Sequence, residues 1–256
     1  MPDDQIALRL RGLTKRFGAM TAVDRLDLDV PRGSFFGLVG PNGAGKTTTL
    51  SMATGLLRPD AGSAHVLGTD VWADPVAAKA RIGVLPDGLR LFDRLTGLQL
   101  VTYAGLLRGM ERDLVAQRVG ELLAALGLTD AQDKLVIDYS AGMTKKITLA
   151  CALVHAPRLL VLDEPFEAVD PVSARTIRGI LEDFAANGGT VVLSSHVMDL
   201  VERICSHVAI IAGGQVRVVG TVDEVRGGMT LDDRFLDLVG GTTDVEGLAW
   251  LRTSSD

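Results

Sequence analysis

Apolar residues follow two different spacings along the chain, one typical of strands and one typical of helices. Strand-like runs cover residues 6–11, 22–30, 34–39, 82–85, 159–162, 190–194 and 208–211. The first two runs alternate apolar and polar positions, which is typical of antiparallel strands with one face in water. Residues 159–162 are apolar throughout and predict a strand buried on both faces.

Helical spacing separates several of these runs. It predicts helices at residues 47–57, which Arg58, Pro59 and Asp60 end, and at 173–186 and 197–205. Between residues 87 and about 156 the strand signal is replaced by apolar positions at helical spacing: Tyr103, Leu106, Leu107 and Met110, then Val115, Val119, Leu122, Leu123 and Leu126. The pattern therefore predicts an α/β fold interrupted by a helical insert.

A glycine-rich loop lies between the third strand and the first helix. It consists of Gly40, Pro41, Asn42, Gly43, Ala44, Gly45, Lys46, Thr47 and Thr48. Glycines let a backbone turn tightly and bring N–H groups to anionic oxygens. We expect Lys46 to place its ammonium on the β- and γ-phosphates, Thr47 to offer a hydroxyl to Mg²⁺, and the helix that begins near Lys46 to point its positive end at the phosphates. The loop predicts binding of a nucleoside triphosphate.

Two carboxylates follow the apolar strand at residues 159–162. A buried strand of this kind delivers its last residues to the edge of the sheet where the phosphate loop lies. We assign Asp163 to Mg²⁺ and Glu164 to the attacking water, which it positions or deprotonates. Two solvated acids at a strand end are the alternative, which the neighbouring phosphate loop makes less favoured.

Composition narrows the class of protein. The 256 residues fit one large α/β domain with an insert, and the formal net charge of −6 argues against a broad nucleic-acid surface. We expect Cys151 and Cys205 to be buried, reduced thiols in a reducing compartment. The acidic N-terminus does not resemble a secretion signal, and no apolar run is long enough to cross a bilayer, so we expect a cytosolic chain.

Residues 139–143 read Tyr-Ser-Ala-Gly-Met and precede an apolar helix through Leu153. Ser140 suits the N-cap of that helix, and Gly142 would let a ligand approach the first turn. Taken alone, the pentapeptide predicts no more than an ordinary capped helix. Its place about twenty residues before the acidic strand end favours a role in ligand binding.

Taken together and in this order, these motifs resemble those of the nucleotide-binding subunits of ATP-binding cassette (ABC) transporters. Residues 40–48 match the Walker A loop, 139–143 the signature motif and 159–164 the Walker B strand. Val169 and Asp170 match the D-loop, His196 the switch histidine, and Phe17 the aromatic residue that stacks on adenine, although a lone Phe is more often part of a core.

The resemblance implies a P-loop NTPase core with an antiparallel β subdomain and an inserted helical subdomain at about 87–156. It places the ATPase domain at 1–226 and a short C-terminal helix and tail at 227–256, where Leu231, Phe235 and Leu238 recur at helical spacing. We expect these three to fold back on the core and residues 242–256 to be loose.

In the family, two subunits face head to tail and each ATP lies between the Walker A loop of one and the signature helix of the other. The resemblance thus gives Ser140 and Gly142 contacts with the γ-phosphate bound by a second copy, or by a related subunit. Asp170 would help link the two sites, and His196 would hydrogen-bond the γ-phosphate; a satisfied core histidine is the alternative.

This chain departs from the family pattern at specific positions. Asp87 follows the strand at 82–85 where the family usually has Gln in its Q-loop, and we assign it there as a shorter, anionic contact to metal and water. The signature is Tyr-Ser-Ala-Gly-Met rather than Leu-Ser-Gly-Gly-Gln, and Ala168 replaces a residue that is often Gly. We expect ATP to be sandwiched between subunits, with turnover that is slow or dependent on a partner.

The resemblance also implies partners. An ATPase without membrane segments needs a separate membrane permease, and we expect this chain on the cytoplasmic face of the membrane as part of a two-component, ABC-2 type exporter of drugs, lipids or glycans. Leu89, Leu91 and Phe92 are candidate permease contacts, with internal packing as the alternative for each. Two other functions stay open: a soluble ABC-type ATPase that assembles or remodels something without transport, and a weakly active regulatory subunit.

Overall fold

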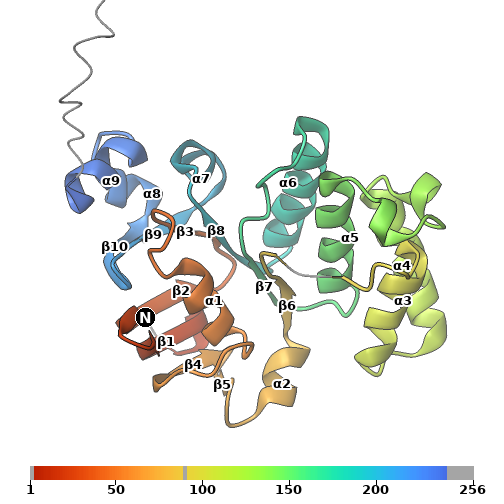
Figure 1. Cartoon of the computed structure of the whole chain (residues 1–256), viewed down its shortest axis with the longest axis horizontal. Coiled ribbons are helices and arrows are strands. Elements are labelled where there is room, and N and C mark those ends of the chain that lie inside the picture. Colours follow the sequence, from red (N-terminus) through yellow and green to blue (C-terminus); the bar gives the residue numbers. More distant parts are fainter. Residues whose placement is uncertain (1–2, 89–90, 241–256) are drawn as a thin grey trace, which may run out of the picture.

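The computed structural model describes residues 3–88 and 91–240 (Figure 1). Its strands are β1 (Ile6–Phe17), β2 (Met20–Pro31), β3 (Phe35–Val39), β4 (Ala61–Val66), β5 (Thr69–Asp70), β6 (Ile82–Leu85), β7 (Leu159–Leu162), β8 (Thr190–Ser195), β9 (His207–Ala212) and β10 (Gln215–Thr221). Its α-helices are α1 (Lys46–Ala53), α2 (Pro75–Ala80), α3 (Gly97–Leu107), α4 (Arg112–Ala125), α5 (Ala141–Leu153), α6 (Pro171–Ala186), α7 (Met198–Ile204), α8 (Val222–Arg226) and α9 (Leu231–Val239).

A central sheet runs in the order β10-β9-β3-β8-β7-β6. The strands from β9 to β6 are parallel, and β10 pairs antiparallel with β9 at the edge. Side chains of β3 alternate between two hydrophobic clusters: Phe36 and Leu38 belong to one, Phe35 and Val39 to the other. The sheet is therefore buried on both faces, which is why its strands read as nearly continuous apolar runs.

The N-terminal antiparallel sheet covers one face of the central sheet, together with α1. Its order is β2-β1-β4-β5, and its apolar positions, such as Leu10 and Val23, pack with Leu38 and Met52 in one cluster. The antiparallel pairing of the first two strands was predicted correctly. Both strands are longer than the apolar runs suggested, because backbone pairing continues past the last buried residues to the turn at Phe17–Met20.

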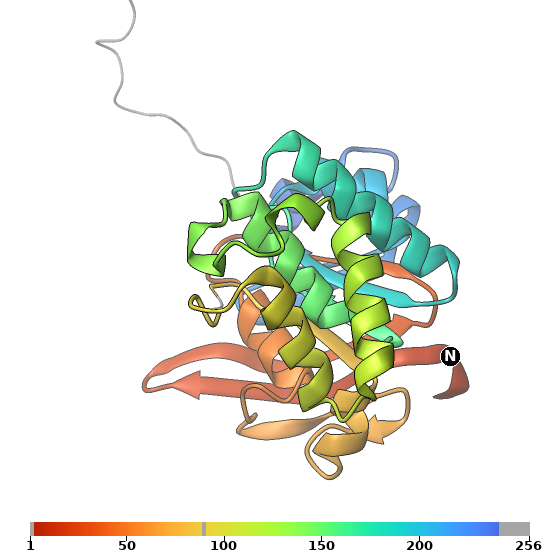
Figure 2. The same cartoon turned by 90° about the vertical axis from the view of Figure 1, so that its right-hand side faces the viewer.

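The helical insert lies against the opposite face of the sheet, beside α6 (Figure 2). Helix formation was predicted correctly here, but the buried side of α3 was not evident from the spacing. Tyr103, Leu106 and Leu107 are exposed, whereas Leu100 and Val101 are buried. The glycines of α3 explain the difference: Gly105 lacks a side chain where Val115 of α4 packs, so the helix approaches its neighbour on the glycine side.

Several boundaries and elements differ from the sequence prediction. Helix α1 ends at Ala53 instead of residue 57, because the Thr54 hydroxyl donates to the Leu50 carbonyl and Gly55 turns the chain with φ of +73°. Strands β4, β5 and β10 and helix α2 were not predicted, since their runs are short or interrupted by glycine and charge.

The C-terminal helix α9 packs on the core as expected. Leu231 is fully buried, and Phe235 and Leu238 lie partly buried against the large helical cluster. The boundary at 226/227 stays a prediction, and residues 242–256 lie outside the described residues.

No helix in the stretches 3–88 and 91–240 is both long and apolar enough to cross a bilayer. Cys151 and Cys205 are both free thiols, as predicted, but only Cys205 is buried, and Cys151 is partly buried. Burial raises the pKa of the Cys151 thiol to about 12 and also raises the pKa of Cys205, so neither is poised as a nucleophile.

Candidate functional site

The carboxyl ends of the parallel strands meet at one edge of the central sheet. Val39 of β3 is level with Ser195 of β8, and Leu162 of β7 is level with Leu193 of β8 and Leu85 of β6. A cavity of about 400 Å³ opens there, and its size suits a nucleotide. It is lined by Phe17, Met20, Ala22, Asn42, Gly43, Ala44, Gly45, Lys46, Thr47, Thr48, Asp87, Glu164, Glu167 and His196.

The phosphate loop is the floor of this cavity. Gly45 has φ of +103°, and a Cβ at this position would lie 2.5 Å from the Ala22 carbonyl oxygen, so only glycine fits. In the described part of the chain no side chain caps α1, which begins at Lys46. The first N–H groups of α1 therefore remain available to an anion.

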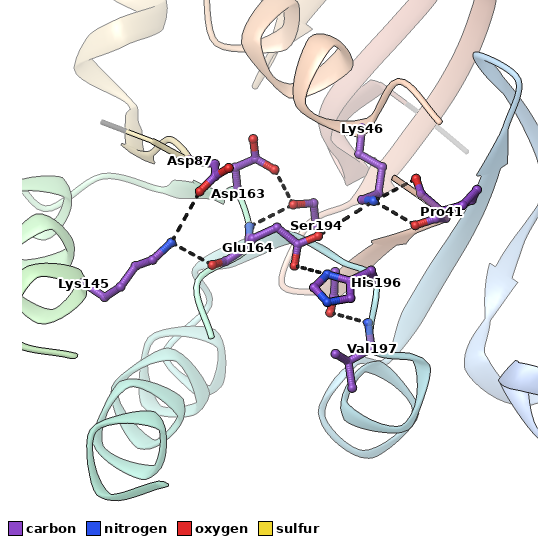
Figure 3. A network of polar contacts seen from close by, with 11 residues as sticks. Pro41, Lys46, Asp87, Lys145, Asp163, Glu164, Ser194, His196 and Val197 are labelled. Carbon is purple, nitrogen blue, oxygen red and sulfur yellow. Dashed lines mark hydrogen bonds and ion pairs between the residues drawn. The ribbon is translucent and has the colours of Figure 1, made fainter. Parts of the chain in front are cut away.

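Lys46 is held by the loop that precedes it. Only 6% of the residue is exposed, and its Nζ donates to the carbonyl oxygens of Gly40 and Pro41 at 2.8 and 3.3 Å (Figure 3). The same ammonium lies 3.8 Å from Oε1 of Glu164. The loop thus holds the buried Lys46 ammonium between its own backbone N–H groups and the Glu164 carboxylate.

Glu164 extends into the cavity from the end of β7. Its Oε2 lies 3.1 Å from Nδ1 of His196, in the loop after β8, so the ring donates through Nδ1–H to the carboxylate in the matching tautomer. The Glu164 side chain is mostly buried and has Lys46 on its other side. Each carboxylate oxygen of Glu164 keeps a lone pair that the His196 and Lys46 contacts do not use, so the group can accept a hydrogen bond, and then a proton, from water.

Asp163 is almost fully buried behind Glu164, with 4% of the residue exposed. The Ser194 hydroxyl donates to Oδ1 of Asp163 and accepts a hydrogen bond from the Glu164 N–H at 2.9 Å (Figure 3). Asp163 is thereby fixed by β8, its neighbour in the sheet, while its second oxygen has no partner among the described residues.

Asp87 lines the same cavity, just beyond the end of β6, and its contact to metal and water stays a prediction. Its ion-pair partner is Lys145 of α5, whose Nζ lies 3.9 Å from Oδ1 and also donates to the Glu164 carbonyl at 2.8 Å. A lysine from the signature helix thus reaches both the Asp87 loop and the Glu164 loop.

Phe17 and Met20 form the far wall of the cavity, from the turn between β1 and β2. The Phe17 residue is 48% exposed, so its ring is available for stacking. Lys15 lies 5.8 Å from the ring centroid and is fixed by the Arg58 carbonyl and by Asp60. Phe17 is therefore not a core residue, which was the alternative.

Ser140, Gly142 and Asp170 lie outside the cavity, at the start of α5 and α6. Ser140 is exposed, and its hydroxyl accepts from the Met143 N–H at 3.3 Å as the N-cap of α5. Asp170 caps α6: its Oδ1 accepts from the N–H groups of Ser173 and Val172, and these bonds hold the pKa of its carboxyl below the ordinary value.

Gly142 explains how these two helix starts fit together. A Cβ on Gly142 would lie 2.6 Å from Oδ2 of Asp170 and 2.7 Å from the Ser173 hydroxyl. Tyr139 is fixed separately, by donating its hydroxyl to the Ala131 carbonyl at 2.8 Å. Four of the five signature residues, Tyr139, Ser140, Gly142 and Met143, therefore have identifiable structural contacts.

Sequence reasoning missed five residues at the site: Met20, Ala22, Glu167, Lys145 and Ser194. The place of Ser194 was available from the pattern, because it ends a strand that lies beside the acidic strand in a parallel sheet. Lys145 carried a weaker signal, one helical turn beyond the N-cap at Ser140. Met20 and Glu167 depend on loop conformations that the sequence pattern does not specify.

Comparisons with known proteins agree with this geometry. The family model described as ABC transporter matches residues 23–167. The daunorubicin/doxorubicin resistance ATP-binding protein DrrA of Streptomyces peucetius is 38% identical over 220 residues, which cover 86% of this chain and 67% of DrrA. The linearmycin resistance ATP-binding protein LnrL of Bacillus subtilis is 34% identical over 214 residues, covering 84% of this chain and 69% of LnrL.

A solved structure described as the ATP binding subunit of an ABC transporter has the same fold. It superposes with a TM-score of 0.84 at 27% identity, and the match covers 91% of this chain and 99% of the other. The chain belongs to the ABC transporter family and is a nucleotide-binding ATPase.

Proposed function

We propose that this chain is the ATP-hydrolysing subunit of an exporter, and that two copies close head to tail on two Mg-ATP molecules. One observation carries the dimer: Ser140 lies exposed at the start of α5, outside the cavity that contains Lys46. A signature motif so placed would meet the nucleotide held by a second copy. Asp170, whose side chain packs against Gly142, would lie at the same contact and link the two sites.

In the proposed reaction, Glu164 accepts the proton of the attacking water. His196 orients that carboxylate through Nδ1 and, from its exposed side, reaches the γ-phosphate. Lys46 and the first N–H groups of α1 bind the β- and γ-phosphates, and Phe17 stacks on the adenine. The paired contacts of Glu164 with His196 and Lys46 favour an active enzyme over a weakly active regulatory subunit.

The residues present fit Mg²⁺. Among the described residues no group of three or more His, Cys, Asp or Glu side chains gathers as a metal cage. Mg²⁺ in such enzymes takes one or two protein oxygens and completes its shell with phosphates and water. Thr47 and the unpartnered oxygen of Asp163 would hold it, with Asp87 as a further carboxylate beside the cavity. When bound, the ion neutralises charge on the phosphates.

The permease would dock on the exposed apolar surface of the helical insert, which places this chain at the cytoplasmic face of the membrane. Phe92 is 61% exposed and packs edge-on against Tyr103 with the ring centroids 5.6 Å apart. Leu106 and Leu107 extend this surface along α3. Leu91 instead packs partly buried against the core, and Leu89 lies outside the described residues. The exporter assignment is supported by a relative whose name is Nod factor export ATP-binding protein I.

Light scattering on the purified chain tests the dimer. The Glu164→Gln variant retains the phosphate loop but lacks the carboxylate that accepts the proton of water. Mg-ATP should therefore double its molar mass, whereas Mg-ADP should not. Ser140→Asp in the same background is the matched control, because its carboxylate would repel the γ-phosphate and keep the chain monomeric. A Glu164→Gln protein that binds Mg-ATP yet stays monomeric would refute the head-to-tail arrangement.

Co-purification after gentle detergent extraction tests the permease contact. The chain should recover an integral membrane protein encoded beside it, and Phe92→Asp should abolish the recovery. Val76→Asp is the control, since Val76 is 79% exposed on α2, away from the insert. Recovery of soluble proteins alone would instead favour an ATPase that acts in assembly or remodelling.

A further inference from the structure

The backbone of Glu164 has an unusual conformation that depends on side chains from other elements. Its φ is +46°, in the left-handed region that residues with a Cβ rarely adopt. The N–H of Glu164 donates to the Ser194 hydroxyl of β8 at 2.9 Å, and its carbonyl accepts from Lys145 of α5 at 2.8 Å. The residue is thus fixed on both sides by tertiary contacts, which is how strained backbones persist at functional sites.

Lys145 is the only one of these anchors that also contacts a second loop of the site, within the described chain. Its Nζ lies 3.9 Å from Oδ1 of Asp87, while most of its side chain is covered (Figure 3). At this separation Lys145 and Asp87 form an ion pair and not a hydrogen bond, while the same ammonium donates to the Glu164 carbonyl at 2.8 Å. The Asp87 carboxylate thus attracts the same ammonium that donates to the Glu164 carbonyl.

We propose that Lys145 is a positioning residue for ATP hydrolysis: it holds the Glu164 peptide, and with it the direction of the catalytic carboxylate, while Asp87 anchors the lysine. The inference rests on the proposed function, because it assumes that Glu164 is the base. It gives Asp87 a role of its own in this chain, as a counter-ion to Lys145.

The position of Lys145 on α5 adds a consequence. Ser140 at the start of this helix would contact the nucleotide of the second copy, and Lys145 lies just over one turn further along. Gly142 rests against Asp170 between them, so this end of α5 is packed without room for independent movement. If α5 moves when the dimer closes, the Lys145 side chain would carry that movement to the Glu164 carbonyl.

Steady-state phosphate release by the full chain, with its permease where that is required for turnover, tests the proposal. Lys145→Met should lower kcat by about 10²-fold, as misplacement of a catalytic group by about 1 Å does. The Kd for a fluorescent Mg-ATP analogue should stay within about twofold, because the phosphate loop is untouched. Lys145→Arg, which keeps the charge and the donors, should recover kcat to within about tenfold of the wild type.

Two further variants make the test specific. Lys134→Met removes one exposed positive charge from the helical insert and should change neither kcat nor Kd. Asp87→Asn should lower kcat less than Lys145→Met does, and in the double variant the two losses should be less than additive. Fully additive losses would overturn the anchoring role of Asp87. If Lys145→Met fails to fold, Lys145→Gln, which keeps an N–H donor group without the charge, should give an intermediate kcat.

The outcomes separate this inference from the proposed function. A Lys145→Met protein with wild-type kcat overturns the inference, and so does one that loses kcat and nucleotide binding together without recovery by Arg, because that result indicates a structural role only. If the wild-type protein itself neither binds nor hydrolyses Mg-ATP, the proposed function fails first.

Discussion

Helices α1 and α5 each begin at a motif assigned to phosphate binding, but their N-termini are satisfied differently. In the described chain α1 begins after Gly45 with no side-chain cap, whereas the hydroxyl of Ser140 caps α5 by accepting from the Met143 N–H. The first helix leaves its N–H groups to the ligand; the second already uses one of its polar groups internally.

We infer from this difference that the N-termini of α1 and α5 bind nucleotide at different steps. The start of α1 is ready for a nucleotide in the single chain, because its N–H groups and Lys46 face one preformed cavity. The start of α5 is capped within the single chain and, in the proposed arrangement, would gain its ligand only when a second copy supplies one. Of the four predictions below, the first three change one of these helix starts at a time, and the fourth concerns the opposite end of α5.

Lys46→Met should have the largest effect. It removes the buried ammonium at the start of α1 and should weaken Mg-ATP binding by roughly 10²-fold, because a hydrogen bond to a charged group contributes about 1.5–3 kcal/mol. Equilibrium titration with a fluorescent ATP analogue measures the loss. Lys134→Met is the control, and unchanged affinity in the Lys46 variant would show that the backbone N–H groups alone hold the phosphates.

Gly142→Ala should disturb the α5 end without affecting the α1 end. The new Cβ would overlap Asp170 and Ser173, so we expect a loss of about 1–3 kcal/mol in the free energy of unfolding, together with loss of ATP-induced dimerisation. Chemical denaturation and light scattering measure the two effects. Gly179→Ala in α6 is the matched control: nothing lies within 4 Å of its Cβ, and it should stabilise by about 0.5–1 kcal/mol.

Ser140 variants separate capping from ligand binding. Ser140→Ala should cost about 1 kcal/mol of stability, because the Met143 N–H loses its acceptor. Ser140→Asp should keep the cap and the stability but lose ATPase activity, since a carboxylate repels the γ-phosphate. Thermal unfolding and phosphate release measure the pair. An active Ser140→Asp enzyme would mean that Ser140 does no more than cap α5.

The smallest effect should come from His155, which lies just beyond the C-terminal end of α5, and it should appear in the dependence of stability on pH. Burial, reinforced by the nearby Arg108, lowers the pKa of its imidazole from 6.5 to about 4. The unfolded chain binds this proton more readily, so the stability contribution is complete above pH 6.5 and is lost as pH falls from there to about 4. Urea unfolding across this range measures the slope of the unfolding free energy against pH. His155→Gln should flatten it, and an identical slope in that variant would assign the effect to other groups.

The pattern of apolar and polar residues along the chain was enough to predict much of the core and the residues around the start of α1. The phosphate loop, Asp163 and Glu164 sit at strand ends, and parallel strands bring their carboxyl ends to one edge whatever the details of packing. Burial on both faces gave β3 and β7 their continuous apolar runs, so these strands were evident before any tertiary information.

The remainder depended on contacts between segments distant in sequence. The exposed side of α3 follows from glycine packing against Val115, which helical spacing alone does not reveal. The Lys145 contact with Glu164 joins residues 19 apart across two elements. The left-handed backbone of Ala168 (φ +56°) accounts for the glycine that the family often has there, a constraint invisible in the sequence of this chain alone.

The phenol of Tyr139 sets the spacing between the signature motif and the apolar surface of the insert. A Cβ on Gly97, the first residue of α3, would lie 2.1 Å from the Tyr139 oxygen, so ring and helix touch without a gap. Tyr139 immediately precedes Ser140, and α3 carries Tyr103. Because Tyr139 contacts Gly97 directly, a rotation of the residues around Ser140 would be passed to α3, the helix that carries the exposed apolar surface.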